Sequence, residues 1–324
     1  MRMVRDERNT VMGDFGTSLN MKKIAIMTSG GDAPGMNAFI RAATRYALDQ
    51  EIEVYGIYEG YQGLIDNRIK QFKRASVRNI IQRGGTILKT SRSEEFMTVE
   101  GRKKAAANLN ALGIEGLICC GGDGSYAGLK EFAGKGGQWQ GSVIGTPGTI
   151  DNDVKGTEFT IGFDTAINTA MHAIDNLRDT GDSHSMHFIV EVMGRHCGDI
   201  GRAVGTASGA ESVLVPETLT NIDDVVSAIQ TRGHNIIIVS EGDEVGGAYK
   251  LAEMLNQRFA TENLIKKPSF RVCILGHIQR GGIPTARDRI LADTMGVKAV
   301  DALVTGENLK AVAVQKNELV LTQL

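Results

Sequence analysis

The stretch that decides the fold is GLICCGGDGSYAG, residues 116–128. Four consecutive apolar residues, at positions 117–120, lead directly into a loop rich in glycine. A short, unbroken apolar run of this kind is typical of a strand that is buried on both faces of a parallel sheet. Ligands of such sheets bind beyond the carboxyl ends of the strands. The stretch therefore predicts an α/β protein whose chemistry lies in the loops that follow its strands.

Similar β-rich runs recur along the chain, and most are followed by longer helix-like stretches. NIIIVSEG at 235–242 is a second buried-strand pattern, and in residues 162–179 apolar side chains recur at helical spacing. The other runs fall at 23–28, 53–58, 142–146, 187–193, 212–217 and 271–276, and the other helical stretches at 37–49, 102–112, 223–232, 247–260 and 284–304. This alternation predicts two similar Rossmann-like lobes, each a mostly parallel sheet flanked by helices, with the active site in the cleft between them.

Composition and charge exclude several classes of protein. The chain has 324 residues, 42% of them hydrophobic, which is enough for two domains with sizeable cores. The formal net charge of −2 gives no overall attraction to nucleic acid or to an anionic membrane. The four cysteines show no C-x-x-C spacing, so we expect reduced thiols in a cytoplasmic protein, with no disulfide and no zinc. No apolar run approaches the roughly 18 residues of a membrane helix, and we interpret residues 1–20 as a loose tail without the apolar core of a signal peptide.

Two glycine loops follow strands in the first half of the chain. TSGGDAPGMNA, at 28–38, closes a strand and opens a helix, so its glycines leave room for a phosphate near helix N–H groups. It matches neither the dinucleotide-binding nor the Walker A pattern, and by itself it is equally well a tight turn. The second loop holds Asp123 between Gly122 and Gly124. A carboxylate beside a phosphate needs a cation between them, which favours a Mg²⁺ ligand over a simple turn residue.

A polar trio follows in GTPGTIDNDVKGTEFTIGFDTA, residues 145–166. If the segment is extended, Thr149, Asp151 and Asp153 point to the same side. Beside a nucleotide, Asp151 is suited to take the proton of a hydroxyl that attacks phosphorus, and Asp153 to assist the metal or to orient the turn. Taken alone, the pattern is better explained by an Asx turn with solvated side chains.

Basic residues follow strands or glycine turns in the second half of the chain. Arg195 lies in GRHCGDIGR, and SFRVCILGHIQRGG supplies Arg271, His277 and Arg280. A guanidinium group binds two phosphate oxygens at once, and Glu241, at the end of another strand, is able to accept hydrogen bonds from sugar hydroxyls. Each of these residues alone is more typical of a surface or structural role. Together they predict a phosphorylated polyol held opposite a nucleotide and Mg²⁺.

Five motifs in this order, TSGGDAPGMNA, GGDGS, PGTIDND, VEVMGRHCGD and LGHIQRGG, resemble those of the bacterial ATP-dependent 6-phosphofructokinases. The similarity runs from about Lys22 to Leu321. It implies transfer of the γ-phosphoryl group of ATP, with Mg²⁺, to the 1-hydroxyl of fructose 6-phosphate, which gives fructose 1,6-bisphosphate and ADP in glycolysis. It also implies a homotetramer, with an ATP-binding lobe at 21–161 plus 278–324 and a sugar-phosphate-binding lobe at 162–277.

The resemblance assigns roles to individual residues. Asp151 is expected as the base on the sugar hydroxyl, with Thr149 near the transferred phosphoryl group and Arg195 at the transition state; Gly31 completes the catalytic set. Asp123 and Asp153 match residues around Mg²⁺. The ATP side comprises Gly31, Arg92, Gly122, Asp123, Gly124, Ser125 and Gly128. The sugar phosphate is expected to contact Thr149, Asp151, Asp153, Met193, Gly194, Arg195, Glu241, Arg271, His277 and Arg280, with Arg271 supplied by a neighbouring subunit.

An effector site between subunits, for ADP or phosphoenolpyruvate, is also implied. Its phosphate-binding positions match Arg41, Arg45, Arg74, Arg178 and Arg232, and Glu211 matches the acid that holds the effector's Mg²⁺. Without the resemblance, these arginines are interpreted as solvated helix charges. Three features depart from the family pattern: Met186 replaces an arginine that reaches the sugar phosphate of a neighbouring subunit, Asn79 replaces an effector-site acid, and the chain stops at ELVLTQL, short of the family's C-terminal helical segment.

Three other functions compete with this one. A pyrophosphate-dependent phosphofructokinase shares the motifs, but Gly124 and Gly148 are expected to leave free space where relatives of that kind place a bulkier Asp and Lys. Lipid and NAD kinases share the GGDG loop without the sugar-binding segment at 271–280. A sensor that binds nucleotide and sugar phosphate without turnover has no need of Asp123, Asp151 and Arg195. The sequence therefore favours an ATP-dependent kinase.

Overall fold

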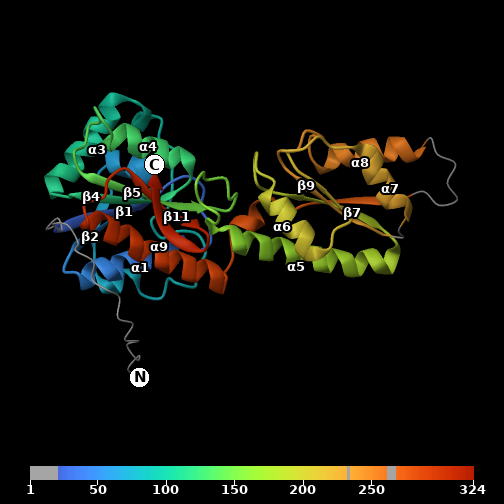
Figure 1. The fold of residues 1–324 in the computed structure, drawn as a ribbon, viewed down its shortest axis with the longest axis horizontal. Coiled ribbons are helices and arrows are strands. Elements are labelled where there is room, and N and C mark those ends of the chain that lie inside the picture. The colour runs from blue at the N-terminus through green and yellow to red at the C-terminus, as the bar shows by residue number, and fades with distance from the viewer. Residues whose placement is uncertain (1–20, 232–233, 261–267) are drawn as a thin grey trace, which may run out of the picture.

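Two α/β lobes lie side by side, and the long helix α5 (Phe163–His184) runs from the first lobe into the second (Figure 1). The computed structural model describes residues 21–231, 234–260 and 268–324. The tail expected over residues 1–20 lies outside the described residues. Within the described ranges, no helix is both long and apolar enough to cross a membrane.

The first lobe is built on a sheet of eight strands. Along its main path the strands follow the order β12-β11-β5-β4-β1-β2-β3, and β6 pairs with β5. The strands are β1 (Lys23–Thr28), β2 (Glu53–Ile57), β3 (Ile69–Phe72), β4 (Gly116–Gly121), β5 (Ser142–Thr149), β6 (Ile161–Gly162), β11 (Lys310–Gln315) and β12 (Glu318–Gln323). Pairing is parallel from β2 to β11, and the two antiparallel pairs lie at the edges. Every residue of β4 is buried, as its unbroken apolar run predicts.

Helices cover the first sheet on both sides and give the lobe two cores. One core contains α1 and α9 packed together beneath the sheet, and the other contains the aromatic rings of Phe96, Phe132 and Trp139. The helices are α1 (Met36–Asp49), α2 (Gly60–Ile65), α3 (Val99–Leu112), α4 (Asp123–Ala133) and α9 (Ala286–Val304), with the 3₁₀ turns η1 (Arg74–Val77) and η2 (Glu95–Met97).

The second lobe has a smaller, wholly parallel sheet in the order β10-β7-β9-β8. Its strands are β7 (His187–Val192), β8 (Ser212–Leu214), β9 (Ile236–Ser240) and β10 (Phe270–Ile274), and its helices are α5 (Phe163–His184), α6 (Asp199–Ser208), α7 (Ile222–Thr231) and α8 (Ala248–Ala260), with η3 (Gly276–Arg280) after β10. The chain enters this lobe along α5 and returns to the first lobe through α9, β11 and β12 (Figure 1).

The predicted fold class is confirmed: both sheets are mostly parallel and flanked by helices. The eight strand runs and six helical stretches each contain an element of the expected type. The sequence patterns miss α2, α4 and α6, whose glycine-rich starts are typical of loops. They also miss the strands β3, β6, β11 and β12, of which β3 and β12 lie at the edges of the sheet.

Candidate active site

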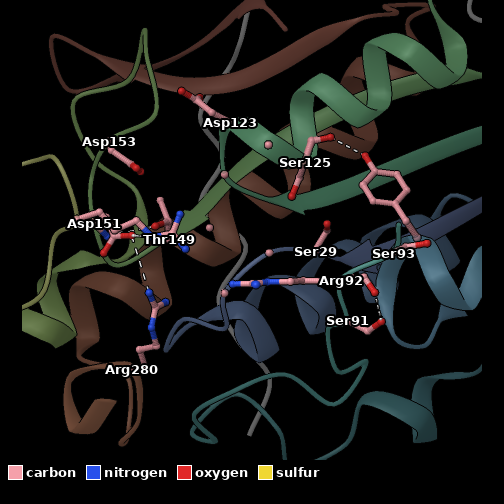
Figure 2. Close-up of a pocket in the computed structure, with 17 residues that line it drawn as sticks. Ser29, Ser91, Arg92, Ser93, Asp123, Ser125, Thr149, Asp151, Asp153 and Arg280 are labelled. Atoms are coloured by element: carbon pink, nitrogen blue, oxygen red, sulfur yellow. Dashed lines mark hydrogen bonds and ion pairs between the residues drawn. The ribbon is translucent and has the colours of Figure 1, made fainter. Parts of the chain in front are cut away.

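A cavity of about 300 Å³ lies where the strand ends of the first lobe face the second lobe. Figure 2 shows the side chains that line it. The structure brings eleven of the predicted residues to its wall: Gly31, Arg92, Gly122, Asp123, Gly124, Ser125, Thr149, Asp151, Asp153, Arg195 and Arg280. These residues come from six separate segments of the chain, so the cavity exists only in the folded protein.

The turn after β5 carries the polar trio, but not as one extended face. Thr149 ends the strand, and its Oγ1 accepts a hydrogen bond from the backbone N–H of Asp151 at 3.2 Å. Asn152 then takes a left-handed conformation, with φ at 55°, which breaks the alternation before Asp153. The prediction of a shared extended face is therefore wrong, although all three side chains line the same cavity.

Asp151 is the most buried acid of the cavity, with 3% of its surface exposed. Its Oδ2 lies 3.6 Å from Arg195 Nε and 3.9 Å from Arg280 Nη2, while its buried Oδ1 has no hydrogen-bond partner. Burial raises the pKa of this carboxyl above its ordinary value; Arg280 opposes the shift and Asp153 adds to it. A buried carboxylate that lines a cavity and has one oxygen without a hydrogen-bond partner is suited to accept a proton from a ligand.

The glycine loop after β4 opens directly into a helix. Gly122 is the N-cap of α4 and Asp123 is its first residue, and residues 122–125 line the cavity, so the N-terminus of α4 borders it. A Cβ atom on Gly122 or Gly124 would meet no protein atom within 4 Å. The cavity is therefore open beside both glycines, as an anionic ligand at a helix N-terminus requires.

The exposed carboxylates of Asp123 and Asp153 both border this opening (Figure 2). Within the described part of the chain, no three metal-ligating side chains come together. Mg²⁺ takes one or two carboxylates and completes its shell with phosphate oxygens and water. This donor set therefore fits Mg²⁺ delivered with a nucleotide and does not fit a metal held by the protein alone.

Gly31 has a packing reason to be glycine. A Cβ atom at this position would lie 2.5 Å from Arg280 Nη1, and the same nitrogen donates a hydrogen bond to the carbonyl of Asp32 at 3.4 Å. Arg280 reaches this loop from η3, at the far end of the second lobe's last strand. A larger residue at 31 would displace the guanidinium group from Asp151.

The loop that carries Arg195 is tightly constrained. Arg195 itself takes a left-handed conformation, with φ at 53°, and its N–H donates to Glu241 Oε1 at 2.9 Å. Gly194, with φ at 139°, lies so close to the Cys197 carbonyl that a Cβ atom would be 2.3 Å from it. The Arg195 loop is therefore fixed both by the hydrogen bond to Glu241 and by the close approach of Gly194 to Cys197.

Six predicted ligand residues do not reach this cavity. Gly128 lies under the ring of Tyr61, and the Met193 N–H donates to Gln279 Oε1 at 2.9 Å. Gly194 and Glu241 support the Arg195 loop as described. His277 is exposed on η3, and Arg271 is exposed on the edge strand β10. Half of the residues predicted to bind the sugar phosphate therefore line this cavity, and the other half lie outside it.

The expected free space at Gly148 is wrong. A Cβ atom there would lie 2.4 Å from Cys120 Sγ and 3.1 Å from Met36 Cε, so this glycine is needed for packing between β5 and β4. Of Gly124 and Gly148, only Gly124 has open space beside it.

The effector positions fall into separate groups. Arg41 and Arg45 lie on α1, and Arg74 begins η1, where it forms an ion pair with Asp49. Arg178, on α5, donates to the carbonyls of Ser208 and Gly209 at the end of α6 and lies 3.6 Å from Glu211 Oε1. Arg232 lies outside the described residues.

Sequence motifs do not point to several cavity residues. Ser29, Tyr61, Ser91 and Ser93 also line the wall, together with Gly30 and Gly148. The Tyr61 hydroxyl donates to the carbonyl of Ser125 and its ring stacks on Phe96, with centroids 4.0 Å apart. Ser29, Gly30 and Gly148 lie within motifs quoted above, whereas no motif contains Tyr61, Ser91 or Ser93. In that part of the chain the resemblance points to Arg92 alone.

The site combines a helix N-terminus open to an anion, two accessible acids, two arginines and a buried carboxylate, set between two α/β lobes. This combination is typical of nucleotide-dependent phosphotransferases. The family model for phosphofructokinase matches residues 23–303. The chain belongs to the phosphofructokinase family.

Curated relatives agree with this assignment. The ATP-dependent 6-phosphofructokinase of Bacillus subtilis is 49% identical over 305 residues, which cover 93% of this chain and 92% of the relative. The enzyme of the same name from Shouchella clausii is 50% identical with the same coverage.

Solved structures share the fold. The phosphofructokinase of Saccharomyces cerevisiae superposes with a TM-score of 0.83 at 36% identity, covering 93% of this chain and 44% of the yeast chain. This chain thus spans less than half of that protein. A pyrophosphate-dependent phosphofructokinase from Marinobacter aquaeolei has a TM-score of 0.78 at 22% identity, a likeness of fold alone.

Proposed function

We propose that this chain is an ATP-dependent 6-phosphofructokinase that converts fructose 6-phosphate to fructose 1,6-bisphosphate in glycolysis. The observation that carries the proposal is Asp151, a buried carboxylate whose Oδ1 has no hydrogen-bond partner; the residue lines a cavity that it shares with a helix N-terminus. The names of curated relatives near 50% identity support the two substrates.

In the proposed reaction, Asp151 accepts the proton of the sugar 1-hydroxyl as that oxygen forms a bond to the γ-phosphorus. The bond from this phosphorus to the β–γ bridging oxygen breaks, and ADP leaves. Arg195 and Arg280, the cations nearest to Asp151, are placed to neutralise charge on the transferred group. The N-terminus of α4 and Arg92 border the part of the cavity assigned to ATP.

Asp123 and Asp153 are the proposed holders of Mg²⁺. When bound, the ion supplies positive charge for the oxygens of the ATP phosphates. The two carboxylates would hold the ion from two separate elements of the first lobe, since Asp123 begins α4 and Asp153 follows the turn after β5.

We expect ATP to be the preferred phosphoryl donor. The open space beside Gly124 accommodates a nucleotide, whereas a carboxylate introduced there would face the donor's phosphates. At equal Mg²⁺, a coupled assay of the parent protein with fructose 6-phosphate should give faster turnover with ATP than with pyrophosphate. Gly124→Asp should lower turnover with ATP at least about tenfold, whereas Gly124→Ala should have little effect. Faster turnover by the parent protein with pyrophosphate would refute the choice of donor.

We further propose that the enzyme is a homotetramer regulated by ADP or phosphoenolpyruvate at a subunit interface. The arginines of α1 and η1 and the Arg178–Glu211 pair lie in different lobes, which fits a site completed by a neighbouring subunit. Either ligand should then shift the fructose 6-phosphate saturation curve, and Arg41→Ala should abolish the shift. Arg41 is preferred to Arg178 for this test because Arg178 also binds the end of α6. No shift in the parent enzyme with either ligand would contradict the proposal.

A further inference from the structure

Asn152, between the two aspartates of the catalytic turn, makes more side-chain hydrogen bonds than the turn needs. Its Oδ1 accepts from the backbone N–H of Thr160 at 3.0 Å, and its Nδ2 donates to the carbonyl of Glu158 at 3.2 Å. Thr160 Oγ1 in turn donates to the carbonyl of Thr149 at 2.7 Å. The amide therefore ties both sides of the loop that carries Asp151 and Asp153.

One bond of Asn152 leaves its own lobe. Nδ2 also donates to Asp199 Oδ2 at 3.0 Å, and Asp199 is the first residue of α6 in the second lobe. Asp199 Oδ1 forms an ion pair with Arg202 Nη1 at 3.5 Å, and Arg202 Nη2 forms a second ion pair with Glu217 Oε2 at 2.9 Å. Glu217 accepts from the N–H of Gly198, the N-cap of α6. The hydrogen bond from Asn152 to Asp199 therefore ends at the N-terminus of α6, which Arg202 and Glu217 hold in place.

The start of α6 is close in sequence to Arg195. Only three residues separate Arg195 from Asp199, and the N–H of Cys197, between them, donates to the Gly194 carbonyl at 2.9 Å. Asp151 belongs to the first lobe and Arg195 to the second, and their side chains are 3.6 Å apart. The hydrogen bond between Asn152 and Asp199 therefore helps to fix the position of Asp151 relative to Arg195.

We propose that Asn152 is a positioning residue that docks the catalytic turn onto the N-terminus of α6 through Asp199, and so holds Asp151 and Arg195 in register across the cleft. The inference rests on the proposed function, because it concerns the same reaction. The left-handed backbone at 152 explains an asparagine or glycine there, but it does not explain the contact with Asp199.

The decisive variant is Asn152→Gly, because glycine keeps the left-handed backbone without strain and removes only the side chain. We expect kcat to fall about tenfold and the KM for fructose 6-phosphate to rise severalfold, while the KM for ATP stays within about twofold, since misplacement of reacting groups by a fraction of an ångström carries a cost of this order. Amide hydrogen exchange at the start of α6 should become faster, with β9 unchanged.

Asp199 supplies the matched controls. Asp199→Ala removes the acceptor and should reproduce the loss, whereas Asp199→Asn keeps an oxygen for the Asn152 amide and should retain most of the activity. The double variant Asn152→Gly/Asp199→Ala should be no worse than the poorer single variant. Additive losses, or an Asn152→Gly enzyme with the parent's kcat and KM, would overturn the inference. A parent protein inactive with ATP and fructose 6-phosphate would instead contradict the proposed function.

Discussion

Asp151→Asn is expected to lower kcat by about 10²–10⁴-fold, because it removes the only buried carboxylate on the cavity wall and leaves the shape of the turn unchanged. The backbone N–H of Asp151 still donates to Thr149 Oγ1 in the variant, so the turn keeps its geometry. The amide lacks a negative charge beside Arg195 and Arg280 and is unable to take up the proton of a hydroxyl. Steady-state kinetics with both substrates would measure the effect.

Binding and pH dependence separate loss of the base from loss of the fold. The dissociation constant for ATP should change much less than kcat, because the nucleotide is assigned to the N-terminus of α4, whereas Asp151 follows β5. Near-parental kcat in Asp151→Asn would rule out its role as the base.

The raised pKa of Asp151 predicts in which direction kcat changes with pH. The carboxylate must be ionised to accept a proton, so kcat should fall as the pH drops through a pKa that lies above the ordinary value of about 3.9. Burial is the main cause of the shift, and the charge of Asp153 adds to it. At saturating Mg²⁺, Asp153→Asn should therefore move the acid limb of the profile to lower pH.

The glycine loop and the acids of the site are predictable from sequence because their signals are local. An apolar strand followed by Gly122, Asp123 and Gly124 predicts a strand end and an anion site within a few residues. The structure adds that the loop is short and that Asp123 already belongs to α4. Helical periodicity fails here because the glycines at its start hide the first turn.

Residues whose role depends on another segment escape such reasoning. Tyr61 lines the cavity because its hydroxyl meets the carbonyl of Ser125, 64 residues away in the chain. Gly148 looks like free space in the sequence but is required by Cys120 on the next strand. Asn152 looks like a turn residue, and its contact with Asp199 spans 47 residues. These pairings are set by the packing of strands and lobes, which no local pattern encodes.

Asp288 shows the same dependence in the connection between the lobes. Its side chain is 1% exposed, and its oxygens accept hydrogen bonds from the N–H of Gly162 at 2.9 Å, from the N–H of Thr165 at 2.8 Å and from the Thr165 hydroxyl. Gly162 is the N-cap of α5 and has no side chain to cap it. A carboxylate from α9 therefore caps the helix along which the chain enters the second lobe.

Removing that cap is expected to cost about 3–5 kcal/mol of the free energy of unfolding. Asp288→Ala leaves the N–H groups of Gly162 and Thr165 without acceptors, and the Thr165 hydroxyl keeps only the bond that it accepts from the Thr285 N–H. Each unsatisfied buried group costs about 1–3 kcal/mol. Proteins have only about 5–15 kcal/mol in total, so the loss should be plain in urea unfolding curves. Asp288→Asn keeps one acceptor oxygen and should lose about half as much. Asp164→Ala is the matched control: Asp164 accepts from the Thr285 hydroxyl at 2.6 Å beside the same junction but is only partly buried, and its loss should stay near 1 kcal/mol. Equal losses in Asp288→Ala and Asp164→Ala would mean that the buried carboxylate does not cap α5 in solution.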